Sequence, residues 1–148
     1  MIKYDSMEKE LVKNSGVDKL ITNDSAKDYQ LIHKLKEKLN DENVVTADKA
    51  YLGLTYLQLF HKSALVRHEA IFVIGEYGPR STFLTYSALS DPEPVVRHEA
   101  CLALGGRSQR VIALRRLTNL EYIAKNDKSE MVRDSARVAL DNIRNFKR

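Results

Sequence analysis

The chain has 148 residues, of which 43% are apolar and 30% are charged, and its net charge is +4. This size suits a single domain with one core. No apolar run reaches about 18 residues, which excludes a membrane-spanning helix, and the charged N-terminus does not resemble a secretory signal. The one cysteine, Cys101, allows no intrachain disulfide and favours a reducing compartment. We therefore expect a soluble, cytoplasmic protein with no membrane partner.

The first predicted helix covers residues 25–40, where apolar side chains recur at helical spacing between lysines. Polar residues at 41–43 break this helix. Thr46 is the expected N-cap of a second helix over residues 47–61. Because the second helix is apolar on nearly every side, we expect it to be sandwiched between neighbouring helices.

Three later segments, residues 64–75, 94–105 and 130–141, align with one another without gaps. Each segment carries an arginine at the same position, and these arginines lie 30 and 36 residues apart. A period of this length is typical of a two-helix unit that stacks on its own copies.

The stretches between the copies predict the second helix of each unit. Residues 82–89 and 111–125 are long enough for one helix each. Polar turns at residues 90–94 and 126–129 then lead into the next copies.

The expected fold is therefore all-α, a superhelix (solenoid) of HEAT-like repeats. We expect one domain over residues 1–148. Within it, residues 1–45 form N-terminal helices and residues 46–148 form the repeats.

Positions that all three copies share should serve the stacking of the repeats. Small and apolar residues recur four and eight residues apart, which places them on one face of each helix. They are Val66, Ala70 and Ile74 in the first copy, Val96, Ala100 and Leu104 in the second, and Val132, Ala136 and Leu140 in the third.

The recurrent arginines, Arg67, Arg97 and Arg133, are interpreted as structural because every copy has one. Asp91 and Asp127 precede two of them by six residues. This spacing predicts a ladder of aspartate–arginine contacts between turns and helices.

Two copies share a further pair that the third copy lacks. His68-Glu69 and His98-Glu99 occupy equivalent positions, where the third copy has Asp134-Ser135. Stacking should therefore not require the His-Glu pair, which leaves either a functional site or a pair inherited by duplication without function.

Metal binding is the chemistry that this pattern favours. Adjacent residues of one helix point about 100° apart and cannot hold one ion together, but equivalent helices of stacked repeats lie about 8–10 Å apart. His68 and His98 could then share an ion with one carboxylate, a donor set that suits non-haem iron, while the histidine pair alone could equally favour zinc. Gly75 and Gly105 follow the histidines by seven residues, either as helix C-caps or to leave this face uncrowded.

Residues 63–78 and 91–106 resemble the paired His-Glu repeats of the deoxyhypusine hydroxylase family, a branch of the phycobilisome-lyase-type HEAT repeats. The resemblance covers residues 46–145. It implies a di-iron centre held by four His-Glu motifs from two homologous halves, and hydroxylation of a modified lysine on a translation factor. This chain has one half only.

On this resemblance we expect a homodimer that supplies four motifs. His68 and His98 would ligate iron, and Glu69 and Glu99 would act as further ligands or as catalytic carboxylates beside it. The substrate would be a protein side chain.

Other functions stay open. Repeat solenoids present extended surfaces to partners, so a non-enzymatic protein-interaction scaffold is the alternative to the enzyme. The small basic excess would permit nucleic-acid contact, but solvated helix faces account for it, and we expect no such partner. Cys101 is interpreted as core packing rather than as a nucleophile, and His33 and His61 as surface or helix-end residues with no partner motif.

Overall fold

The computed structural model describes residues 4–77, 82–106 and 114–145. These residues form eight α-helices, one 3-10 helix and no strand, which confirms the expected all-α repeat fold. The elements are α1 (Tyr4–Ser15), η1 (Val17–Lys19), α2 (Ser25–Lys38), α3 (Val44–Phe60), α4 (Ala64–Tyr77), α5 (Thr82–Ser90), α6 (Pro94–Leu104), α7 (Leu114–Asn126) and α8 (Glu130–Asn145). None of these helices is long and apolar enough to cross a membrane.

Most predicted boundaries are confirmed to within a few residues, but the expected N-cap of α3 is wrong. Asn43, not Thr46, caps this helix, because its side-chain oxygen accepts hydrogen bonds from the backbone N–H groups of Val45 and Thr46 at 3.0 and 3.3 Å. The cap therefore lies inside the stretch predicted as a polar break. The predicted start of α7, at residue 111, lies outside the described residues.

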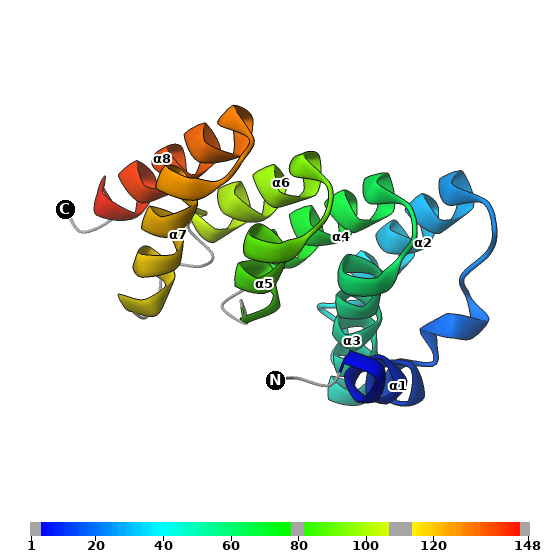
Figure 1. Ribbon diagram of the computed structural model, residues 1–148. Helices are drawn as coiled ribbons and strands as arrows, with labels where there is room; N and C mark the ends of the chain where they lie inside the picture. The colour runs from blue at the N-terminus through cyan, green and yellow to red at the C-terminus, as the bar shows by residue number, and fades with distance from the viewer. Residues whose placement is uncertain (1–3, 78–81, 107–113, 146–148) are drawn as a thin grey trace. The chain divides into compact units, whose positions relative to one another are not determined.

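The chain divides into two compact units, Met1–Ile74 and Gly75–Arg148, called unit 1 and unit 2 below. In unit 1, α1 and α2 both pack against α3 (Figure 1). Tyr51, Leu54 and Leu57 of α3 are buried. This confirms that α3 lies between neighbouring helices.

Unit 2 is built from two helix hairpins. The first joins α5 to α6 and the second joins α7 to α8, and the hairpins stack so that α6 contacts α8 and α5 contacts α7 (Figure 1). We call α4, α6 and α8 the motif helices. Their shared small and apolar positions are all at most 5% exposed, so the predicted stacking faces are confirmed.

Gly105 and Gly75 are required where the next motif helix comes close. A Cβ atom on Gly105 would lie 2.6 Å from Ala139 Cα of α8, and one on Gly75 would lie 2.7 Å from Ala103 Cβ. Gly105 is the C-cap of α6, as predicted, but with a right-handed φ of −84°. Gly75 lies inside α4, so its C-cap interpretation is wrong. The space beside both glycines is filled by protein atoms and is not left open.

Replacing Gly105 by alanine should lower the free energy of unfolding by about 1–3 kcal/mol, because the backbone of α8 must move away from the added methyl group. Urea denaturation measures the change. Gly53→Ala is the matched control, since its Cβ would meet only side-chain atoms, the nearest at 3.4 Å. An alanine gains helix propensity there, so equal losses in the two variants would contradict the close approach.

Candidate functional site

Hydrogen bonds in the turns place α2 in the same register as the motif helices. In the turns before α2, α4, α6 and α8, one side chain accepts a hydrogen bond from the N–H group two residues later, at 2.8–3.0 Å. The accepting residues are Thr22, His61, Asp91 and Asp127, and the residue six positions later is Asp28, Arg67, Arg97 and Arg133 respectively. Tyr29 of α2 is therefore equivalent to the motif histidines, which the sequence pattern did not indicate.

The arginines hold these turns in place. Nη1 of Arg67, Arg97 and Arg133 donates to the carbonyl oxygen of the residue six positions earlier, at 2.9, 2.9 and 2.7 Å. Each arginine thus satisfies a carbonyl in the turn that precedes its own helix. The structural interpretation of the three arginines is confirmed.

Arg97 also joins the two hairpins of unit 2. Its Nε and Nη2 donate to the two carboxylate oxygens of Asp127 at 2.9 and 3.1 Å, and the two side chains are only 5% and 8% exposed. Burial raises the pKa of Asp127, but hydrogen bonds from Arg97 and from the backbone of Ser129 outweigh it and leave the pKa below its ordinary value. The predicted ladder is confirmed here, with the arginine of one copy pairing the aspartate of the next.

The equivalent contact in unit 1 has its carboxylate on the other helix. Asp28 stands in the arginine position and His61 in the aspartate position, and Nε2 of His61 donates to Oδ2 of Asp28 at 2.7 Å. Oδ1 of Asp28 accepts from the N–H and hydroxyl groups of Thr22 at 2.7 and 2.8 Å. Burial raises the pKa of Asp28, yet these hydrogen bonds lower it overall.

His61 is neutral in this arrangement, with its proton on Nε2. Nδ1 accepts the N–H of Ser63 at 3.0 Å, so it carries no hydrogen. His61 does lie at a helix end, as the C-cap of α3. It is also buried and paired with Asp28, a contact for which the sequence showed no partner motif.

His98 is oriented by the third copy. Its Nδ1 lies 2.5 Å from the hydroxyl oxygen of Ser135 on α8. That hydroxyl donates its single hydrogen to the carbonyl oxygen of Met131 at 2.7 Å, so it must accept from Nδ1–H of His98. Nε2 of the neutral ring then presents a lone pair, and no described residue of unit 2 forms a hydrogen bond with it.

Glu69 is held by two side chains of α2 in unit 1. Nε2 of His33 lies 3.5 Å from Oε1 of Glu69, whose side chain is 14% exposed. The rings of Tyr29 and His33 lie 5.3 Å apart. The pKa of Tyr29 is raised, first by partial burial and then by the charge and hydrogen bond of Glu69. His33 is 48% exposed, which confirms its assignment to the surface, and its partner is Glu69.

These contacts follow one rule within each unit. The residue in the histidine position of one helix contacts the residue in the glutamate position of the next: Tyr29 with Glu69 in unit 1, and His98 with Ser135 in unit 2. The His-Glu positions therefore also take part in contacts between stacked helices, although those contacts do not require a His-Glu pair. A serine hydroxyl accepts a hydrogen bond as a carboxylate does, so the third copy keeps the contact without the motif.

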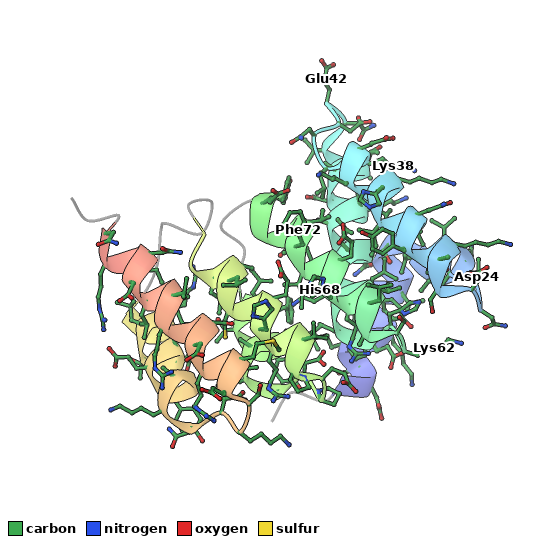
Figure 2. All side chains as sticks on the ribbon, turned by 90° about the horizontal axis from the view of Figure 1, so that it is seen from above. Asp24, Lys38, Glu42, Lys62, His68 and Phe72 are labelled. Atoms are coloured by element: carbon green, nitrogen blue, oxygen red, sulfur yellow. The ribbon has the colours of Figure 1, made fainter. Side chains whose placement is uncertain are left out.

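The four predicted metal-binding residues are all half-buried on their helices, His68 and Glu69 on α4 and His98 and Glu99 on α6. Figure 2 shows His68 and Phe72 on successive turns of α4. Within residues 4–77, 82–106 and 114–145, no three His, Cys, Asp or Glu side chains form a cluster that could hold a metal ion. Metal binding stays a prediction that depends on a second copy.

Cys101 is a core residue, as predicted. It is fully buried, and burial, with a smaller contribution from Asp127, raises the pKa of its thiol to about 12. A thiol with so high a pKa carries almost no thiolate at neutral pH.

Residues 54–141, more than half of the chain, match the sequence family described as HEAT repeats. No curated protein matches the chain.

Proposed function

Because the chain belongs to the HEAT-repeat family, we propose that it is a protein-binding repeat module that recognises its partner with the exposed side of its motif helices. Exposed apolar side chains at equivalent positions support this function. Val95 on α6 is equivalent to Met131 on α8, and the two are 42% and 43% exposed. Val138, two turns after Met131, is 48% exposed.

A single exposed apolar residue is ordinary on a protein surface. Here, however, the residues recur on one side of two helices that pack against each other. His98 and Ser135 lie on the same side, between the apolar positions. We call Val95, His98, Met131, Ser135 and Val138 the motif face of unit 2. Repeat proteins use such extended faces to bind other proteins.

Replacing Val95 and Val138 together by aspartate should weaken partner binding at least tenfold. Each valine buried in the interface contributes about 1.5–3 kcal/mol to binding, and an aspartate there would lose this contribution and bury a charge. Affinity capture with the wild-type chain would identify the partner, and calorimetry with the purified partner would give the dissociation constant. Tyr122→Asp is the control, since Tyr122 is 61% exposed on α7, outside the motif face. Equal affinity of all three proteins would contradict this recognition surface.

The geometry of His98 favours a second function, a deoxyhypusine-hydroxylase-like iron-dependent monooxygenase formed by a homodimer. A ring held through Nδ1–H with a free lone pair on Nε2 is typical of a metal-ligating histidine. His68 and His98 of each copy would be ligands, with Glu69 and Glu99 as carboxylates. Glu69 keeps acceptor capacity beyond its two contacts in unit 1. Iron would supply the activation of dioxygen for hydroxylation of a lysine-derived protein side chain.

Iron content tests this second function. The chain purified from iron-supplemented cells should contain about one iron per chain as a dimer, and His68→Ala and His98→Ala should lose it with unchanged thermal melts. Ser135→Ala should weaken metal affinity about 10–100-fold, because the His98 ring loses its support. Asp134→Ala is the control and should retain iron, because Asp134 occupies in the third copy the position that His68 and His98 occupy in the first two. A monomer without iron would rule this function out.

A further inference from the structure

Arg133 is the end of the arginine ladder among the described residues. It donates Nη1 to its own turn, as Arg67 and Arg97 do. Arg97 uses its Nε and Nη2 atoms to bind both carboxylate oxygens of Asp127. For Arg133, no described residue pairs with this edge of the guanidinium. The same side chain, in the same position of the repeat, therefore presents the donors of a two-point carboxylate contact.

Arg133 lines an open groove between α7 and α8 with a volume of about 610 Å³. Four cations line the groove, Lys125, Arg133, Arg137 and Arg144, together with Glu121. Arg137 and Arg144 already have acidic partners, Asp134 for the first and Glu121 and Asp141 for the second. Lys125 and Arg133 have none in the part of the chain that the structure describes.

The surface around Arg133 is built for water or a polar partner. Ile71 and Cys101 stand four residues after Arg67 and Arg97 and are fully buried. The equivalent residue of α8 is Arg137, whose side chain is 55% exposed. An apolar helix would therefore not pack well on this face, whereas an acidic chain would.

We infer that the groove between α7 and α8 binds an acidic segment of a partner protein, with one aspartate or glutamate carboxylate seated on Arg133 as Asp127 is seated on Arg97. The planar guanidinium matches a carboxylate at two points, and Lys125 supplies further positive charge at the groove. This inference goes beyond the proposed protein-binding role, because it assigns a second surface, distinct from the motif face, and the chemistry of what it binds.

A second copy of this chain fits the groove less well than an acidic segment. Stacking end to end would offer the turn before α2, where Thr22 stands in the position of Asp91 and Asp127. A threonine at that position offers no carboxylate to the guanidinium of Arg133. Nucleic acid also fits less well, since Glu121, Asp134 and Asp141 already pair with Arg137 and Arg144. Only Arg133 and Lys125 are then left to meet an anion, which suits one carboxylate better than a chain of phosphates.

The probe for this site is a synthetic peptide of residues 124–131, the segment whose Asp127 already sits on Arg97, with its two lysines replaced by glutamine so that the peptide is acidic. Titrated into the ¹⁵N-labelled full chain, it should shift the Nε–H resonance of Arg133, and the same peptide with asparagine in place of its aspartate should bind at least about tenfold more weakly. Arg133→Lys keeps the charge and a donor for the turn carbonyl, but it cannot bind a carboxylate at two points. Its affinity for the peptide should therefore fall by a similar factor.

Lys128→Gln removes one charge from the neighbouring turn outside the groove and should leave the affinity within about twofold. Thermal melts verify that each variant is folded. Equal binding of both peptides, or unchanged binding by Arg133→Lys, would overturn the inference, as would a short single-stranded RNA that displaces the peptide at lower concentration. The Val95→Asp, Val138→Asp double variant should bind the peptide with wild-type affinity. This result distinguishes the groove from the motif face, because either surface can then be disproved without the other.

Discussion

Replacing Arg97 by alanine should lower the free energy of unfolding by about 3–5 kcal/mol, the cost of leaving one charge of a buried pair without its partner. Asp127 would lose both side-chain hydrogen bonds from Arg97, and the carbonyl oxygen of Asp91 would lose its donor. Urea denaturation at neutral pH measures the loss. Arg133→Ala is the matched control, since the structure shows only its contact with the turn carbonyl, and it should cost about 1 kcal/mol.

The effect of Arg97→Ala should depend on pH. The folded pKa of Asp127 lies below its ordinary value of 3.8, so the pair stabilises the protein above that value and the stabilisation is lost as pH falls through the folded pKa. In the variant, the unpaired buried carboxyl group favours the protonated form. The difference in stability between wild type and variant should therefore shrink in acid, and a difference that stays constant below about pH 4 would contradict this assignment.

An arginine in place of Asp28 together with an aspartate in place of His61 should reproduce in unit 1 the arrangement seen in unit 2. Asp28→Arg alone sets a guanidinium against the Nε2–H of His61, and His61→Asp alone sets two carboxylates against each other. Each should cost about 3 kcal/mol or more, because a buried charge loses its partner. The double variant should recover about 2–3 kcal/mol of the summed loss as a coupling free energy, since the introduced guanidinium could then reach both the carbonyl of Thr22 and the introduced carboxylate.

A double-mutant cycle by urea denaturation measures that coupling. His61→Asn is the control, because an asparagine oxygen still accepts the N–H of Ser63 while adding no charge. Losses that add without any recovery would show that the two pairs are not equivalent positions of one ladder.

The periodicity of the sequence predicted the repeat fold well because burial imposes it in every copy. The valine, alanine and leucine or isoleucine positions must each meet a neighbouring helix, so they recur and are visible without a structure. The arginines recur for the same reason. The position of α2 in this register was hidden, because Thr22 and Asp28 perform with different side chains what Asp91 and Arg97 perform.

The contacts of the His-Glu positions could not be predicted from the motif. At these positions of neighbouring helices, Tyr29 forms a hydrogen bond with Glu69, and His98 forms one with Ser135. Residue identity alone does not reveal which atoms meet. In the aligned copies, Asp134-Ser135 looks like the absence of a site, whereas Ser135 sets the tautomer of His98. His33 lies outside the repeat alignment, so its contact with Glu69 had no signal in the sequence.

The Arg97–Asp127 pair also governs how unit 2 can come apart. Arg97 is tied at one edge to the turn before α6 and at the other to the turn before α8. The last hairpin cannot swing away while the first stays intact unless opposite charges separate where little water reaches them. Partial opening therefore carries the cost of separating this buried pair in addition to the packing that is lost. Two stacked hairpins that could fray one after the other are bound into a single cooperative folding unit.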